Sequence, residues 1–171
     1  ATFVHLNLHS EFSLTNGLVR IKPLAKALQA NNMPAVALTD QSNLCAMIKF
    51  YKAMRGAGIK PIVGVAIWLE NHEEPDSPSR LTLLAKNDLG YRNMTELVSR
   101  AYTAGQSMGK AIVSTEWLES AAEGIIVLSG GKEGAVGRAL LAGRKDLAQT
   151  KSCRPFCSIL GSCCARASIC C

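Results

Sequence analysis

The sequence predicts an α/β fold in which parallel strands lie inside a distorted, incomplete (β/α) barrel and helices lie outside. Two observations lead to this prediction. Through the first 149 residues, short apolar runs alternate with segments of helical periodicity. The runs are apolar at nearly every position, which is typical of strands buried on both faces of a parallel sheet. A complete (β/α) barrel takes about 250 residues, so this 171-residue chain is expected to hold part of one.

The chain begins with a predicted strand, a helix and a second strand. Residues 3–8 alternate between two sets of side chains with a period of two. Residues 23–30 place apolar side chains at helical spacing, and Pro34 then restarts the chain. Residues 35–39 form a short apolar run that ends at Asp40. This order is the start of a strand, helix, strand alternation.

A second helix is predicted over residues 43–57. Gly56 and Gly58 are expected to end it, because glycine favours the C-terminal end of a helix. The predicted core stripe of this helix consists of four apolar side chains at helical spacing, namely Leu44, Met47, Ile48 and Tyr51.

The remaining elements continue the alternation up to residue 149. They are a strand over 62–69, a loop over 71–79, a strand over 81–85, helices over 91–104 and 115–122, a strand over 124–128 before the glycine turn at 130–131, and a helix over 135–147. Ser114 is the predicted N-cap of the helix that follows it. Residues 150–171 show no strand or helix periodicity, so a domain boundary is predicted near Gln149. Residues 1–149 would then be an incomplete domain.

The composition is that of one ordinary globular domain, with 48% hydrophobic and 19% charged residues. The net charge is +6, but residues 1–149 carry only +3 of it, which fits a solvated surface and does not by itself indicate nucleic-acid binding. The apolar runs are shorter than the roughly 20 residues that cross a membrane. The first residues also lack a signal-peptide pattern. A cytoplasmic protein is therefore expected.

Six of the seven cysteines lie in the last nineteen residues, namely Cys153, Cys157, Cys163, Cys164, Cys170 and Cys171. Cys45 is the other one, and a single cysteine in the body of the domain fits a reducing compartment. One interpretation of the tail is a zinc site with four cysteine ligands. Adjacent cysteine pairs are awkward for tetrahedral ligation, however, and no histidine accompanies them.

Residues near the predicted strand ends are the candidate site positions, because chemistry in a parallel α/β barrel gathers at the C-terminal ends of strands. The positions are His5, Asn7, His9, Asn16, Asp40, Gln41, Ala66, Arg80 and Gly131. His5 and His9 lie on one face of the first strand and, with Asp40, suggest a metal site. Hydrogen-bonded structural histidines are the alternative interpretation.

Six blocks of the sequence resemble, in order and in spacing, the PHP (polymerase and histidinol phosphatase) domain at the N-terminus of the bacterial DNA polymerase III alpha subunit. The blocks are residues 3–14, 38–44, 58–64, 81–87, 90–93 and 124–130. The match runs to about residue 149. Because the cysteine tail departs from the family beyond Gln149, we prefer a shift of the reading frame to a zinc site as its interpretation. The match implies a truncated piece of a DNA-directed DNA polymerase, a nucleotidyltransferase of DNA replication.

The resemblance also implies a metal site that has lost its ligands. Active members of the family hold two or three metal ions with histidines, carboxylates and a cysteine, and the metals activate water for phosphoester hydrolysis. Of the seven ligand positions inside the match, only His9 keeps a ligand. The other six hold Asn7, Gln41 and Arg80 in place of histidines, Asn16 in place of aspartate, Ala66 in place of glutamate and Gly131 in place of cysteine. The resemblance therefore implies that the chain holds no metal and no catalytic residue.

Arg80 brings a fixed cation to a position where the family has a metal ligand. Burying an unpaired charge costs several kcal/mol, so we hypothesise that Arg80 pairs with a carboxylate at the mouth of the barrel, such as Asp40. An ordinary surface arginine is the alternative.

A structural role is what the resemblance implies for such a degenerate domain. It would brace the rest of the polymerase III alpha chain, dock a separate proofreading exonuclease subunit, meet DNA through the holoenzyme and have no membrane partner. Mg²⁺ would belong to a palm domain outside this chain. The alternative is an active metal-dependent phosphoesterase with 3′-5′ exonuclease-type proofreading.

Overall fold

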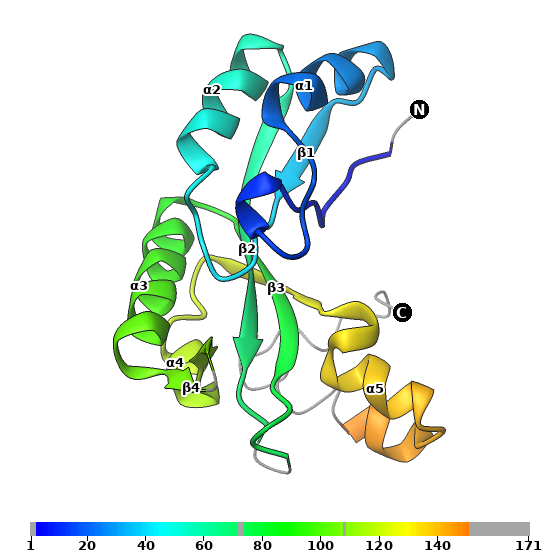
Figure 1. Ribbon diagram of the computed structural model, residues 1–171, viewed down its shortest axis with the longest axis vertical. Helices are drawn as coiled ribbons and strands as arrows, with labels where there is room; N and C mark the ends of the chain where they lie inside the picture. The colour runs from blue at the N-terminus through cyan, green and yellow to red at the C-terminus, as the bar shows by residue number, and fades with distance from the viewer. Residues whose placement is uncertain (1–2, 72–73, 108, 151–171) are drawn as a thin grey trace.

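The computed structural model describes residues 3–71, 74–107 and 109–150 of the chain. A long central strand, β2 (Lys60–Leu69), runs through two groups of elements (Figure 1). The first group, at the top of Figure 1, holds α1 (Ile21–Ala30), β1 (Ala35–Leu38) and α2 (Met47–Gly56). The second holds the later strands and helices. Strand β2 therefore joins the two halves of the molecule.

The N-terminal segment lies beside β1 but forms only one bridge of a ladder, between His5 and Val36. The backbone carbonyls of His5 and Leu8 accept hydrogen bonds from Ala37 and Thr39. The N–H of Leu8 donates to the Thr39 hydroxyl, 3.0 Å away, instead of to a backbone carbonyl. The strand predicted over residues 3–8 is therefore reduced to an extended segment, because side-chain bonds take the place of ladder bonds.

The sheet is mixed, and the expectation that its strands are parallel is wrong for β3 (Ser79–Ala85). Strand β1 pairs with β2 in parallel, whereas β3 is antiparallel both to β2 and to β6 (Ile125–Ser129). The chain segment between β2 and β3, residues 70–78, is shorter than the dozen or so residues that a parallel crossover needs. The loop predicted there is present, and its length sets the direction of the strand after it.

Two short strands were not predicted from the sequence. They are β4 (Gln106–Ser107) and β5 (Lys110–Val113), which pair with each other in antiparallel fashion. Strand β5 also pairs in parallel with the end of β2, and the sheet order is β4-β5-β2-β3-β6. Its two ends do not pair with each other among the described residues, so the sheet is open and does not close into a barrel.

Capping residues set where the later helices begin. Helix α3 (Asp88–Ala104) is capped by Asn87, which accepts from the N–H of Gly90. Helix α4 (Thr115–Ser120) is capped by Ser114, as predicted. Helix α5 (Ala135–Leu141) is shorter than the predicted 135–147, because the chain leaves the helix at 142–144 with Gly143 at a φ of +72°. A further helical turn follows at 145–150.

Helix α2 buries a different face from the one predicted. Ala46, Phe50 and Met54 are fully buried against α1 and β1. Ile48 and Tyr51, which belong to the predicted core stripe, are 62% and 45% exposed. The helix has apolar side chains on two faces, and the more buried of the two is the one that the sequence pattern did not single out.

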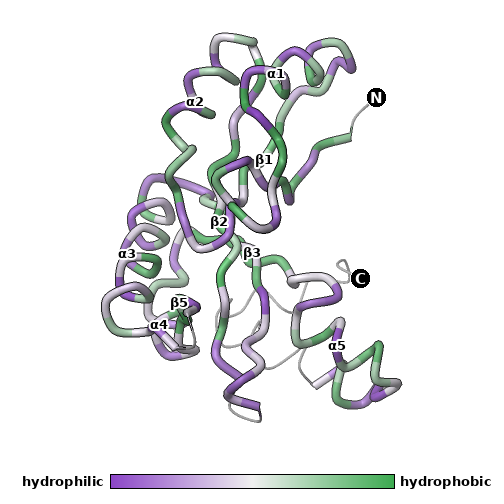
Figure 2. The backbone as a smooth tube through the Cα atoms, viewed as in Figure 1, coloured by the Kyte–Doolittle hydropathy of each residue, from purple (hydrophilic) through white to green (hydrophobic). Residues whose placement is uncertain are grey.

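Two apolar clusters hold the fold together. One joins α1, α2 and β1, and the other packs α3 and α4 against the later part of the sheet. Figure 2 shows apolar segments along the strands where they cross the centre of the molecule, and a hydrophilic β2–β3 connection. Among the described residues, none of the helices combines the length and apolar character of a membrane span.

Candidate functional site

Asp40 lies at the end of β1 and is the buried anchor of the site, with 1% of its surface exposed. Its carboxylate accepts three hydrogen bonds, from the N–H of Ser10 at 2.6 Å, the hydroxyl of Ser10 at 2.7 Å and the hydroxyl of Ser13 at 2.7 Å. Such donors replace the hydration that a buried charge loses. Asp40 therefore holds the segment 10–13 against β1.

Gly17 fixes the turn that follows this segment. A Cβ atom at residue 17 would lie 1.8 Å from the carbonyl oxygen of Ser10, so only glycine fits. Asn16, before it, is exposed in the turn. The Asn16 side chain therefore stands on the surface of the loop that Asp40 anchors.

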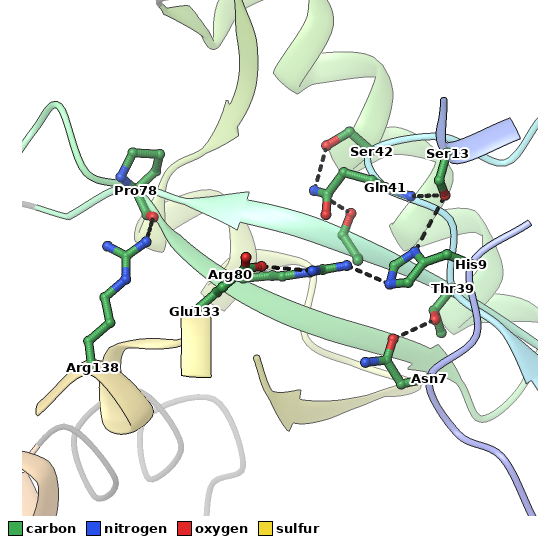
Figure 3. A network of polar contacts seen from close by, with 11 residues as sticks. Asn7, His9, Ser13, Thr39, Gln41, Ser42, Pro78, Arg80, Glu133 and Arg138 are labelled. Carbon is green, nitrogen blue, oxygen red and sulfur yellow. Dashed lines mark hydrogen bonds and ion pairs between the residues drawn. The ribbon is translucent and has the colours of Figure 1, made fainter. Parts of the chain in front are cut away.

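His9 links the Asp40 anchor to β3. Its Nδ1 lies 3.4 Å from the Ser13 hydroxyl, and its Nε2 contacts Nη2 of Arg80 (Figure 3). A guanidinium can only donate, so Nε2 accepts, and Nδ1 carries the proton that faces Ser13. Burial, followed by the positive charge of Arg80, lowers the pKa of His9, against smaller opposing effects of Asp40 and Glu133. His9 is thus held as a neutral imidazole.

Arg80 is the centre of the site, and its ionic partner is Glu133. The Nη1 atom of Arg80 lies 2.8 Å from Oε2 of Glu133, and the Arg80 side chain is only 12% exposed. The hydrogen bond from Arg80 lowers the pKa of Glu133 below its ordinary value. The hypothesis that Arg80 pairs with a carboxylate at the mouth holds, but Asp40 was the wrong partner. Three donors from residues 10 and 13 already surround Asp40.

Gln41 and Ala66 lie side by side next to Asp40. Their strands meet in a parallel bridge, and Nε2 of Gln41 donates to the Ala66 carbonyl at 3.2 Å. The N–H of Gln41 donates to the Ser13 hydroxyl at 3.1 Å. Ala66 is fully buried and has no side-chain donor or acceptor. At these two positions the chain therefore forms hydrogen bonds between its own groups.

The other predicted positions lie around the cluster. The Asn7 side chain is exposed, and its Oδ1 accepts from the Thr39 hydroxyl at 2.9 Å. His5 lies farther back along β1, beside Val36, with its ring edge-on to Phe3 at 4.8 Å. The structure favours the hydrogen-bonded interpretation for His9, whose two ring nitrogens contact Ser13 and Arg80. The contact found for the His5 ring is the one with Phe3, so the two histidines do not form one site.

Gly131 acts through its backbone. Its φ of +58° lies in the left-handed region, which glycine adopts without steric strain, and it begins the 3-10 turn η2 (Gly131–Glu133). That turn brings Glu133 back to Arg80. Gly131 was the last candidate residue taken from this strand end, so Glu133 was not predicted. Including two more residues after the strand would have found it. Ser10 and Ser13 were missed as well, although both lie within the first matched block.

A second arginine joins the same two parts of the chain. Arg138 of α5 donates from Nη1 to the Ser77 carbonyl and hydroxyl, at 3.0 and 2.7 Å, and from Nη2 to the Pro78 carbonyl at 3.0 Å (Figure 3). Gly130 allows close contact on the other side, because a Cβ there would lie 2.0 Å from the Arg80 carbonyl oxygen. The segment from β6 to α5 is thus held against the β2–β3 hairpin by two guanidinium groups.

The donor atoms of the site do not fit a cluster of two or three metal ions. Arg80 places a positive charge in it, and the Nε2 lone pair of His9 already accepts from that guanidinium. Within residues 3–71, 74–107 and 109–150, no group of three histidine, cysteine or acidic side chains is arranged to hold a metal. The arrangement can orient segments of the chain, and we derive no catalytic step from it. The cysteine tail, residues 151–171, lies outside the described residues.

The family model and the sequence relatives agree on one family. The PHP domain model matches residues 5–156. The DNA polymerase III subunit alpha of Pseudomonas aeruginosa is 57% identical over 148 residues, which is 86% of this chain and 13% of that protein. The Vibrio cholerae subunit alpha is 47% identical over 154 residues, 90% of this chain and 13% of that protein. The Escherichia coli K12 subunit is 47% identical over 145 residues, 85% and 12% respectively.

These relatives are much longer than this chain, which spans only 12–13% of their length. Among solved structures, an amidohydrolase from Chromobacterium violaceum has a TM-score of 0.46 at 13% identity, covering 90% of this chain and 49% of its own.

Proposed function

We propose, from the premise that the chain belongs to the PHP domain family, that it is a structural and docking domain of a DNA polymerase III alpha subunit and acts in DNA replication. The observation that carries the structural part is the contact of Arg80 with both His9 and Glu133. The guanidinium of Arg80 lies among the positions at which the resemblance places metal ligands. His9 and Glu133 bind it there.

The contacts of Arg80 support a bracing role, because they connect three segments that are distant in sequence. His9 belongs to the N-terminal segment, Arg80 to β3 and Glu133 to the turn after β6. The path runs from Asp40 through Ser13 and His9 to Arg80 and Glu133. Groups of the chain itself therefore fix these three segments relative to one another.

The activity and partners of the whole protein follow as part of the same proposal. The parent chain would add deoxynucleotides to a primer, with Mg²⁺ in a polymerase domain outside this sequence. The partners of the domain would be the rest of the alpha chain, a proofreading exonuclease subunit and, through the holoenzyme, DNA. A cytoplasmic location goes with these partners.

Metal content and hydrolysis test the proposal together. The whole 171-residue chain, purified and dialysed against buffer with manganese, zinc or iron, is expected to retain less than a stoichiometric amount of each metal. It is also expected to leave bis(p-nitrophenyl) phosphate unhydrolysed above the buffer rate. One or more bound ions per chain together with hydrolysis would instead support the metal-dependent phosphoesterase. A denatured sample of the same preparation controls for adventitious metal.

A further inference from the structure

A wide groove of about 840 Å³ lies away from the Arg80 site, between α2 and the start of α3. The side chains of Leu6, Ile62, Ile126 and Leu128 line it from the strand side, and Ile48 and Tyr51 line it from α2. Leu6, Ile48, Tyr51 and Ile126 are each at least 41% exposed. Apolar side chains that converge on one open hollow mark interaction sites more often than scattered ones do.

Helix α2 provides the clearest sign that something covers this groove. One face of the helix is in the core through Phe50 and Met54. The neighbouring face carries Ile48 and Tyr51 into the groove. A helix that is apolar on two sides is normally buried on both. The described residues cover only one side.

The strand at the floor of the groove is not suited to pairing with an added strand. Residues 60–63 of β2 pair with β1 on one side, and β3 joins the other side only from Gly64 onward. The N–H of Lys60 donates to Pro34, on the β1 side, so the nitrogen of Pro61 faces the free edge. Proline has no N–H to donate there. The groove therefore offers apolar side chains and not a backbone ladder.

The rim of the groove is basic. Lys52, Lys60 and Lys86 are exposed around it, and Asp88 is the one acidic residue in its lining, in the first turn of α3. A second copy of this chain is a poor occupant, because a symmetric contact would bring like lysines together. Nucleic acid is a poor occupant as well, because the strand side of the lining is aliphatic and the lining has only two aromatic residues. Tyr51 is 45% exposed, whereas Tyr91 packs against the core cluster, so the groove does not offer the row of exposed rings on which bases stack.

We propose that the groove binds an acidic amphipathic segment of a partner protein, with apolar side chains against Ile48, Tyr51 and Ile126 and carboxylates beside the three lysines. Helix-in-groove recognition of this kind uses a few apolar anchors with charges around them. This inference rests on the docking role proposed above and deepens it. Metal content, which tests the structural role, does not depend on peptide binding, so the two can fail separately.

The test uses two fluorescein-labelled synthetic peptides and the whole 171-residue chain. Both peptides carry leucines at i, i+3, i+4 and i+7; one has glutamate at the other positions and the second has lysine there. Fluorescence anisotropy is expected to show at least about tenfold tighter binding of the glutamate peptide at low salt, with the preference shrinking as salt screens the charges. Ile48→Asp is expected to weaken binding by about tenfold or more, since it removes a central anchor.

Matched variants separate the groove from the rest of the surface. The pair Lys52→Glu and Lys86→Glu is expected to abolish the preference for the glutamate peptide. Lys26→Glu in α1 and Leu141→Asp in α5 change exposed residues elsewhere and are expected to leave binding unchanged. If Ile48→Asp does not melt cooperatively, the lysine pair, which lies on the surface, keeps the test decisive.

Four results would overturn the inference. The first is equal binding of the two peptides, and the second is binding that Ile48→Asp and the lysine pair leave unchanged. Displacement of the peptide by oligothymidylate would identify a nucleic-acid surface instead. A dimer that sediments as one species and that Ile48→Asp converts to monomer would mean that a second copy fills the groove.

Discussion

The Arg80 site and the α2 groove lie on the same open sheet. They differ in whether their side chains find partners within the described part of the chain. At the Arg80 site, charged and polar groups from three distant segments bind one another. At the groove, Ile48, Tyr51 and Ile126 are all more than a third exposed. At the Arg80 site the charged side chains are paired within the chain, although Nε of Arg80 and Oε1 of Gln41 are buried without a hydrogen-bond partner among the described residues. At the groove, the described residues leave apolar surface uncovered. Stability should therefore depend on the first region and binding on the second.

The largest stability effect is expected from Asp40→Ala. Removing the carboxylate leaves two hydroxyls and one N–H, of Ser10 and Ser13, without their buried acceptor. We expect the free energy of unfolding to fall by about 3 kcal/mol, measured by urea denaturation. Asp76→Ala, at an exposed loop position, is the control and should change it little. Equal effects of the two substitutions would contradict the anchoring role of Asp40.

Arg80→Met is expected to rank second. It keeps an unbranched chain out to the position of Nε and removes the donors to His9 and Glu133. Because Glu133 is 42% exposed, solvent screens the pair, and we expect a loss of about 1–3 kcal/mol instead of the larger cost of a fully buried pair. Arg92→Met on the exposed side of α3 is the matched control. A double-mutant cycle with Glu133→Gln measures the coupling; no coupling would mean that the contact stabilises nothing.

Acid is expected to weaken the Arg80 site through His9. The pKa of His9 is lowered in the folded protein, so the unfolded chain takes up the proton first as pH falls below about 6.5. Stability should therefore fall from pH 7 downward until His9 is also protonated in the folded state. The lowered pKa of Glu133 adds a further loss below its ordinary value. Thermal melting from pH 7.5 to 5.5 measures the first part, and His9→Gln should flatten it.

The smallest stability effect is expected from Ile48→Asp in the groove. The residue is 62% exposed, and surface substitutions of this kind usually change stability by less than about 0.5 kcal/mol. The same substitution is expected to weaken peptide binding strongly. A loss of stability comparable to that of Arg80→Met would mean that the groove is already covered by the chain itself, and the contrast between the two regions would disappear.

Much of the fold could be predicted from the sequence where local chemistry decides it. Residues 35–38 of the predicted run form β1 because they are all apolar, and Ser114 caps α4 because its hydroxyl accepts from the N–H of Trp117. The direction of β3 was missed, although the short connection before it contains the answer. In α2, two apolar faces have equal helical spacing, and only the packing of Phe50 shows which one enters the core.

The site was predicted in part for a similar reason. Asp40 and Arg80 come directly before or after apolar runs, so a rule about strand ends finds both. Their partners come from segments whose approach depends on turns, through the 3-10 turn that carries Ser13 and the glycine turn that carries Glu133. A rule applied strand by strand contains no distance between residues 80 and 133, and it therefore cannot assign the ion pair.

The pair formed by Arg80 and Glu133 also makes this contact independent of the concentration of free metal ions. A bound ion obeys mass action, so the stability that it gives falls when its free concentration falls or a chelator competes for it. A guanidinium is part of the polypeptide and cannot dissociate. Wherever this pair holds β3 to the turn after β6, the hold is present at every metal concentration and is assembled as soon as the chain is synthesised and folded.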